Sequence, residues 1–210
     1  MMEGIRVELS RQGSLIALER QEFERQLRGK EDLILESYHL NKGREDFTEG
    51  RVLYERAEFG AAIPVLERSV QVLEQGLRHT PEIRDLHESL LLLGICHSAN
   101  GNEPKARQVL SRLVELDPNR ELDPIHYPPH TLSLYKDVWE TVHRQAFGRL
   151  DIQLSAGQQG EVWVDGISRG PAPLVVRDIP PGLHHVLVTS SEGHGGYQAM
   201  TVAEGRTQAA

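Results

Sequence analysis

The chain has 210 residues, a length typical of one or two domains, and 26% of its residues are charged. Its formal net charge of −8 argues against a surface for nucleic-acid phosphates, which proteins bind mainly with lysine and arginine. The single cysteine, Cys96, excludes an intrachain disulfide.

The N-terminal residues predict no export signal. Residues 1–11 alternate apolar and polar side chains, which indicates a short strand or an irregular lead-in. They lack the basic leader and apolar run of a signal peptide, and no stretch of the sequence could span a membrane. From Ser14 the spacing is helical, and a break at Gly29 precedes a second, short helix over 32–40.

Residues 86–118 predict two helices folded back on each other, because apolar residues recur at the i, i+3, i+4 spacing in both halves. Between them, Gly101 suits a helix stop and Asn102 suits the cap of the next helix. Small Gly94 and Ala106 are expected to face each other where the helices cross. Cys96 lies inside the first apolar stripe and is expected to pack as a small apolar residue.

Residues 44–79 repeat this pattern, with Gly50 and Ala62 in the corresponding places and a turn at 57–59. Both units resemble the tetratricopeptide repeat, a helix-turn-helix of ~34 residues that stacks on copies of itself. Because Gly50 and Gly94 are 44 positions apart, the helix over 61–78 is expected to run about ten residues longer than the regular repeat allows.

After Pro118 a proline-rich stretch predicts an ordered connector, and Pro128-Pro129 starts another helix. The wide apolar face of residues 129–146 is typical of a helix that caps a repeat stack. Trp139 is expected to pack in that face.

At Gly148 the apolar period changes from 3.6 to 2, and glycine or proline separates the alternating runs that follow. This pattern predicts a small antiparallel β domain with a tight hairpin at Asp165-Gly166. The runs Glu-Val-Trp-Val-Asp-Gly, Arg-Gly-Pro-Ala-Pro-Leu and Ile-Pro-Pro-Gly-Leu-His-His-Val resemble a PEGA domain over residues 148–205. Whether the last strand, near Thr201, is complete stays open at this point.

Ten histidines raise the question of a metal site, and the closest group is His184, His185 and His194. Neighbouring residues of a strand point to opposite faces, so His184 and His185 are poorly placed to hold one ion. We expect these imidazoles to lie on strand and loop surfaces, and His97 to pack inside its helix pair. The sequence predicts no catalytic, metal-binding or cofactor-binding residue.

A partner-binding groove is the one site that the resemblance implies. In tetratricopeptide arrays the first helix of each pair lines the concave side. Carried over to this chain, the groove is lined by Arg44, Phe47, Arg51, Tyr54, Glu55, Leu91, Ile95, Ser98 and Ala99. An aromatic and two arginines beside an apolar strip suit a peptide or helix with an acidic end. The alternative is that Phe47, Leu91 and Ile95 are covered by the chain's own N-terminal helices or capping helix.

The sequence therefore predicts an α+β multidomain protein: an all-α, tetratricopeptide-like repeat domain over 1–147 and a small all-β, PEGA-like antiparallel sheet or sandwich over 148–210. The expected function is a non-catalytic scaffold that binds another protein. The resemblance implies a bacterial source and the cell envelope, if an export signal precedes Met1; otherwise the chain is expected in the cytoplasm. A cytoplasmic regulatory subunit of a signalling kinase system is the alternative, and a metal-dependent enzyme is a third. The partner of the β domain, protein or cell-surface carbohydrate, stays open.

Overall fold

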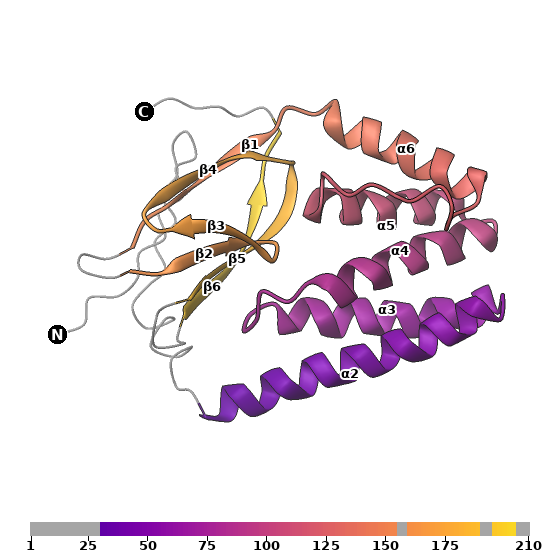
Figure 1. Ribbon diagram of the computed structural model, residues 1–210, viewed down its shortest axis with the longest axis horizontal. Helices are drawn as coiled ribbons and strands as arrows, with labels where there is room; N and C mark the ends of the chain where they lie inside the picture. Colours follow the sequence, from indigo (N-terminus) through magenta and orange to yellow (C-terminus); the bar gives the residue numbers. More distant parts are fainter. Residues whose placement is uncertain (1–29, 155–158, 190–194, 205–210) are drawn as a thin grey trace. The chain divides into compact units, whose positions relative to one another are not determined.

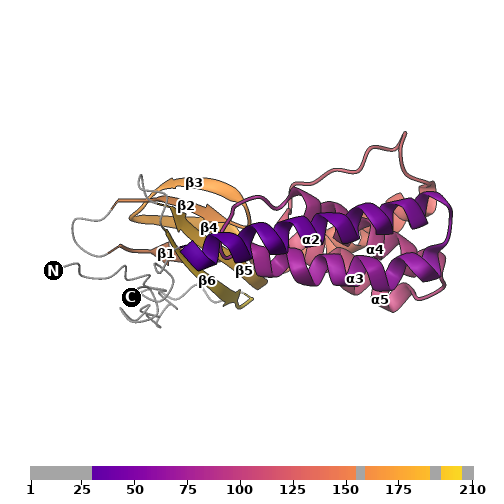
Figure 2. The ribbon, with the colours of Figure 1, turned by 90° about the horizontal axis from the view of Figure 1, so that it is seen from below.

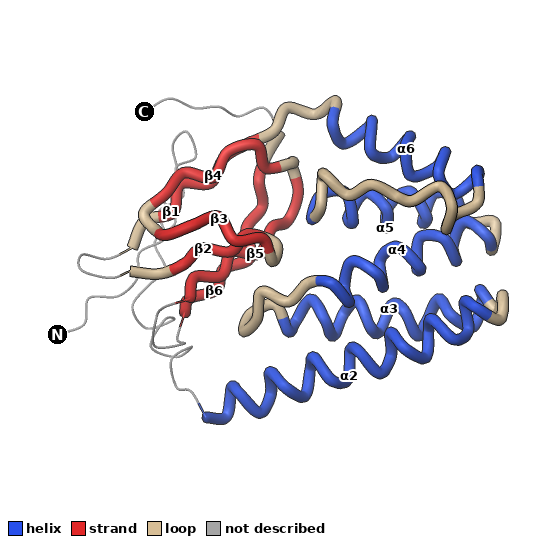
Figure 3. Tube along the Cα trace, viewed as in Figure 1, coloured by secondary structure: helices blue, strands red, loops and turns tan. Residues whose placement is uncertain are grey.

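The computed structural model describes residues 30–154, 159–189 and 195–204. Helices come first along the chain and antiparallel strands follow, which confirms the predicted α+β layout (Figures 1 and 3). The strand or lead-in predicted over 1–11 and the helix predicted from Ser14 lie outside the described residues.

The helices are α2 (Lys30–Glu55), α3 (Phe59–Gly76), α4 (Arg84–Ala99), α5 (Glu103–Leu116) and α6 (Pro129–His143). Figures 1 and 2 show α2 and α3 running side by side, and α4 and α5 following them in the same back-and-forth manner. Two helical hairpins are thus present where the sequence predicted them.

The prediction of a separate short helix over 32–40 is wrong, because α2 runs without interruption from Lys30 to Glu55. Gly43 lies inside it, where glycine ordinarily costs about 0.5–1 kcal/mol relative to alanine. A β-carbon at Gly43 would lie 2.6 Å from Cδ2 of Leu73, so glycine allows the leucine of α3 to approach the α2 backbone. The close helix contact explains why α2 contains a glycine between the short helix predicted to end at residue 40 and the repeat unit predicted to begin at residue 44.

The same kind of contact occurs in both hairpins where their two helices cross. A β-carbon on Gly94 would lie 2.7 Å from Leu110, and one on Gly50 would lie 2.6 Å from Leu66. Each glycine therefore accepts a leucine side chain 16 positions later. The expected alanine partners, Ala62 and Ala106, are fully buried at the same interfaces, but the nearest neighbours of the glycines are leucines.

The turns between the helices follow the predicted chemistry. Gly101 has φ +77, a conformation that favours glycine, and Asn102 accepts a hydrogen bond from the backbone N–H of Lys105 as the cap of α5. The long second helix of the first hairpin is 18 residues, against 14 for α5. The rest of the extra length lies in the link between Gly76 and Arg84, not in the helix as predicted.

Six strands follow the helices: β1 (Gly148–Ile152), β2 (Glu161–Val164), β3 (Ile167–Pro171), β4 (Leu174–Ile179), β5 (Gly182–Thr189) and β6 (Gly195–Val202). The pair β1-β4 forms one antiparallel sheet, and β3-β2-β5-β6 forms a four-stranded one. The hairpin at Asp165-Gly166 joins β2 to β3, with φ of 50 and 72 at its two residues, as predicted. Strand β6 pairs with β5 from Gly195 to Val202, so the last strand matches its neighbour in full.

The alternating apolar residues meet in one core. Its buried members include Leu150, Ile152, Val162, Val164, Val176, Val186 and Val188. Alternation in the sequence predicted these positions. Strand β3 follows the predicted turn, but no alternating run marked it in the sequence, because its residues are mostly exposed.

Contacts along the chain define two compact units. The helical unit comprises Ser37–Gly76 and Glu82–Arg144, and the β unit includes the described residues from Gln145 onward. Leu77–Pro81, although it lies between α3 and α4 in sequence, groups with the β unit. A domain boundary at 147/148 stays a prediction.

Candidate functional site

The predicted groove residues of α2 differ in how far they are available to a partner. Arg44 is engaged with α4, since its Nε lies 2.7 Å from Asp85 and its Nη2 lies 3.1 Å from Glu82. Arg51 and Glu55 are exposed, and the Arg51 guanidinium lies 5.6 Å from the centre of the Phe47 ring. The α2 part of the groove thus offers a cation stacked on an aromatic ring.

Phe47 and Tyr54 are half-buried. Both pack on the core cluster of Ala62, Leu66, Leu92, Leu93 and Cys96, and the Tyr54 ring lies 5.9 Å from that of Phe59. Burial raises the pKa of the Tyr54 hydroxyl. These two rings therefore help to hold α2 on the hairpin as well as forming its surface.

The predicted groove residues of α4 are largely covered. Leu91 has 0% of its surface exposed and Ile95 has 7%. Ser98 Oγ lies 3.1 Å from His130 Nε2, and only Ala99 is exposed. Leu91, Ile95 and Ser98 follow one another at the three- and four-residue steps of a single helix face, so something must lie over that face.

The connector, residues 117–128, contacts this face of α4 near its start. At the start of the same face of α4, His87 Nδ1 lies 3.8 Å from the carboxylate of Asp117, and Glu88 accepts a hydrogen bond of 2.7 Å from Arg120. Figures 1 and 2 show the connector leaving α5 and running back along the helices to the start of α6. The connector thus meets α4 at His87 and Glu88, and the first turn of α6 meets it at Ser98. The groove and its alternative both stay predictions.

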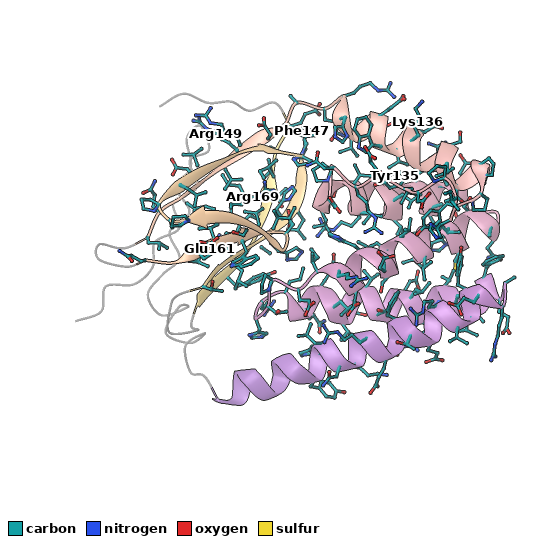
Figure 4. All side chains as sticks on the ribbon, in the orientation of Figure 1. Tyr135, Lys136, Phe147, Arg149, Glu161 and Arg169 are labelled. Carbon is teal, nitrogen blue, oxygen red and sulfur yellow. The ribbon has the colours of Figure 1, made fainter. Side chains whose placement is uncertain are left out.

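The helix α6 holds the connector from its other side. The Tyr135 hydroxyl donates to the Arg120 carbonyl at 3.0 Å, and Trp139 Nε1 donates to the Pro118 carbonyl at 2.9 Å. Tyr135 and Trp139 are four residues apart, so both lie on one face of α6. Figure 4 labels Tyr135 on this helix. Burial raises the pKa of Tyr135 to about 12, which keeps its hydroxyl protonated as a donor at neutral pH.

These contacts define a slot. We use the name for the site between α4 and α6 formed by His87, Glu88, Tyr135 and Trp139, which holds residues 117–120. Burial lowers the pKa of the Arg120 guanidinium, but the hydrogen bond to Glu88 and the nearby negative charges together outweigh it, and the net shift of the pKa is upward. One wall therefore binds a cationic side chain, and the other binds two backbone carbonyls. Each neutral hydrogen bond of this kind contributes about 0.5–1.5 kcal/mol.

Beyond the slot the connector forms an exposed arch, residues 121–126. Asp123 Oδ1 accepts from the Ile125 N–H at 2.8 Å, and Asp123 Oδ2 lies 2.8 Å from His126 Nδ1. Ile125 has 88% of its surface exposed. Only Leu122 in the arch is half-buried, so the arch has few contacts that fix it to the helices.

An open hollow of about 880 Å³ lies on another part of α2 and is lined by Asn41, Arg44, Glu45, Thr48, Glu49, Val52, Leu53 and Arg56. Of the predicted groove residues only Arg44 belongs to it, and that side chain is already paired with two carboxylates. The hollow and the predicted groove are therefore different surfaces.

The expectation that His184 and His185 lie on the surface is wrong. His184 has 0% of its surface exposed, with Nδ1 2.6 Å from Asp165 Oδ2 and Nε2 2.7 Å from the Pro180 carbonyl. A carbonyl can only accept, so Nε2 carries a proton, and the bond to Asp165 requires a second one on Nδ1 or on the carboxyl group. His185 Nδ1 lies 2.7 Å from the Tyr197 hydroxyl. His194 lies outside the described residues.

The pair has a structural role that the sequence did not reveal. Asp165 Oδ1 also accepts from the His185 N–H at 2.8 Å, so one carboxylate ties the β2–β3 turn to strand β5 at two points. Within residues 30–154, 159–189 and 195–204, no three His, Cys, Asp or Glu side chains gather in a way that could hold a metal ion.

Three single-residue predictions have clear outcomes. Cys96 is fully buried in the helical core, and burial raises the pKa of its thiol to about 11, which confirms its packing role. His97 is buried as predicted. Trp139 is not a core residue, since 36% of its surface is exposed and its ring stacks on His143 at 3.7 Å.

Comparison with models of protein families, with curated proteins and with solved structures finds no match for this chain. Among the helices that the structure describes, none combines the length and the apolar character needed to cross a membrane.

Proposed function

We propose that the chain is a non-catalytic scaffold or adaptor that binds another protein along the face shared by α2, α4 and α6. One observation carries this proposal: that face already holds a proline-containing segment outside the helices, the connector, through side-chain donors and an ion pair. Such a surface offers groups that bind both the backbone and a charged side chain of a peptide. The exposed Arg51 and Glu55 next to Phe47 extend it along α2.

The resemblances to the tetratricopeptide repeat and to the PEGA domain remain hypotheses. The glycine-to-leucine contact repeated in both hairpins supports a tetratricopeptide-like array, and the antiparallel strands with their Asp165-Gly166 turn support a PEGA-like module. A bacterial cell-envelope setting follows from these resemblances alone. The signalling-kinase and metal-enzyme alternatives have no observation in their favour among the described residues, and both stay predictions.

Affinity capture from the native cell, with partners identified by mass spectrometry, tests the scaffold. Arg51→Ala removes an exposed arginine from the proposed face, and we expect capture to fall by about fivefold or more, since an interface arginine is often worth over 1 kcal/mol. Arg84→Ala, at the exposed start of α4, is the matched control and should leave capture unchanged. If both variants capture the same proteins as the unmodified chain, this face is not the binding surface.

A further inference from the structure

The β unit contains a histidine whose two ring nitrogens both face oxygen atoms. His184 is fully buried, with Nδ1 2.6 Å from a carboxylate oxygen of Asp165 and Nε2 2.7 Å from the carbonyl oxygen of Pro180. A neutral imidazole carries one N–H and can donate to only one acceptor. The Asp165–His184 pair therefore holds two protons, one on Nε2 and one in the bond between Nδ1 and the carboxyl group.

Within the described residues this pair has few other polar neighbours. Asp165 Oδ1 accepts from the His185 backbone N–H at 2.8 Å, and no further hydrogen bond or ion pair reaches either side chain of the pair. On β6, the residue that pairs with His184 across the sheet is the buried Met200. The charges of Asp165 and His184 are thus compensated only by each other.

Other titratable and charged side chains of the adjoining segments face solvent or the opposite side of the sheet. The His185 ring lies on the other face of β5, because neighbouring residues of a strand alternate, and its Nδ1 lies 2.7 Å from the Tyr197 hydroxyl. Arg177 and Asp178, which precede Pro180 at the end of β4, are exposed. The proton balance of the buried pair is therefore set within the pair.

Above neutral pH the unfolded chain binds fewer protons than the folded pair. A free histidine loses its second proton near about pH 6.5 and a free aspartate is ionised there, so together they hold one proton. Folding then takes up one proton, and for this reason the stability of the folded state falls as pH rises. Loss of that proton in the folded protein would leave a buried nitrogen facing an oxygen with no hydrogen between them, which is costly.

We propose that the Asp165–His184 pair makes the β unit sensitive to pH, because the β2–β3 turn is fixed to β5 by a proton that is lost as pH rises above neutral. Asp165 lies in that turn, with φ 50, and binds β5 at two points, the His184 ring and the His185 N–H. Without the extra proton the first contact becomes repulsive and only the second remains. This property belongs to the β unit alone and does not depend on the scaffold function.

Asp165→Asn is the matched variant for a test. Its amide oxygen can accept from the His185 N–H, and its amide nitrogen can donate to Nδ1 of a neutral His184, so the same contacts form without the extra proton. Asparagine also tolerates the positive φ of the turn. His79→Gln changes an imidazole of the link that groups with the β unit, and serves as the control.

Denaturant unfolding of the full chain, followed through Trp163 of β2 in a Trp139→Phe background, measures the response to pH. Between pH 7 and pH 8 we expect the unfolding equilibrium constant to rise about tenfold, as the release of one proton on unfolding requires. His79→Gln should show the same rise, and Asp165→Asn should show none. A constant value in the background chain, or an equal rise in Asp165→Asn, would overturn the proposal.

Nuclear magnetic resonance of the folded, unmodified chain decides the same question if Asp165→Asn does not fold. The nitrogen shifts of the His184 ring and the carbon shift of the Asp165 carboxyl group locate the protons at pH 7.5. Two protons on the pair support the proposal, whether both are on the ring or one is on the carboxyl group. A ring with one protonated nitrogen beside an ionised carboxylate would refute it.

Discussion

In the helical unit the buried hydroxyls of Ser69 and Ser89 lie within hydrogen-bond distance of backbone carbonyls and of each other. In the β unit the buried Asp165 and His184 bond to each other. Ser69 lies 2.9 Å from both the Gly43 carbonyl and Ser89, and Ser89 donates to the Asp85 carbonyl at 2.7 Å. These neutral groups link three helices. The β unit instead places two ionisable side chains at 2.6 Å in its interior.

The difference matters for how each unit responds to mutation. Losing one neutral hydrogen bond costs about 0.5–1.5 kcal/mol, whereas removing one partner of a buried ionisable pair costs about 3–5 kcal/mol, because the other is left without compensation. Removing one partner of the Asp165–His184 pair should therefore cost the β unit more than losing one serine hydroxyl costs the helical unit. The chain has two tryptophans, Trp139 in α6 and Trp163 in β2, so fluorescence can follow each unit separately.

The largest expected effect is in the β unit. Asp165→Ala removes the carboxylate that binds His184 and the His185 N–H, and we expect a loss of about 3–5 kcal/mol in the free energy of unfolding. Denaturant unfolding followed by Trp163 fluorescence in a Trp139→Phe background measures it. Asp178→Ala is the matched control, because Asp178 also has positive φ (59) but is exposed. Equal losses in the two variants would assign the effect to backbone conformation and not to the buried pair.

Ala106→Leu tests packing in the helical unit. Ala106 is fully buried between α4 and α5, and overpacking such a contact typically costs about 1–3 kcal/mol. We expect the melting temperature reported by Trp139 to fall by several degrees, while Trp163 reports no change. Ala99→Leu, at an exposed position of α4, should leave both signals unchanged. A melting curve for Ala106→Leu that matches that of Ala99→Leu would refute the hairpin register.

A smaller effect, of pH, is expected in the helical unit. Burial lowers the pKa of His97, an effect that Lys105 reinforces and Glu67 opposes. Because the folded-state pKa lies below that of the unfolded chain, about 6.5, unfolding takes up a proton and stability falls as pH drops below that value. We expect His97→Gln to reduce this loss between pH 7.5 and pH 5.

Stability is measured through Trp139 at each pH. His126→Gln, which changes an exposed imidazole of the arch, is the control and should keep the slope of the unmodified chain. An unchanged slope in His97→Gln would mean that other groups carry the pH dependence.

Local patterns in the sequence predicted much of the fold. Helical spacing, the cap at Asn102 and the turn at Asp165-Gly166 each depend on residues within a few positions of one another, and the structure has all three. The uninterrupted α2 was missed because Gly43 depends on Leu73, a residue of another helix.

Contacts between distant residues explain what could not be predicted about the site. Burial of Leu91 and Ile95 depends on residues that pack over α4 from elsewhere in the chain, and nothing near Glu88 in sequence specifies its pairing with Arg120. The same holds for His184, whose partner Asp165 lies 19 positions earlier. In each case the pattern showed an apolar or polar side chain but not the group that it would meet.

The smallest expected effect tests whether the two units are independent. Expression of residues 1–147 alone should give a folded helical fragment with the melting temperature that Trp139 reports in the full chain, because the period of the sequence changes at Gly148 and the linking segment is short. Trp139 is the single tryptophan of that fragment, so tryptophan fluorescence and circular dichroism both report the helical unit.

The link between α3 and α4 decides how the two melting temperatures compare. Its residues Leu77–Pro81 stay in the fragment, although in the full chain they group with the β unit. A melting temperature several degrees lower would show that this link needs the strands to hold α3 and α4, and the boundary at 147/148 would then divide one cooperative unit. An unchanged value would show that the buried Asp165–His184 pair and the helical core are stabilised separately, so that a mutation in one leaves the other intact.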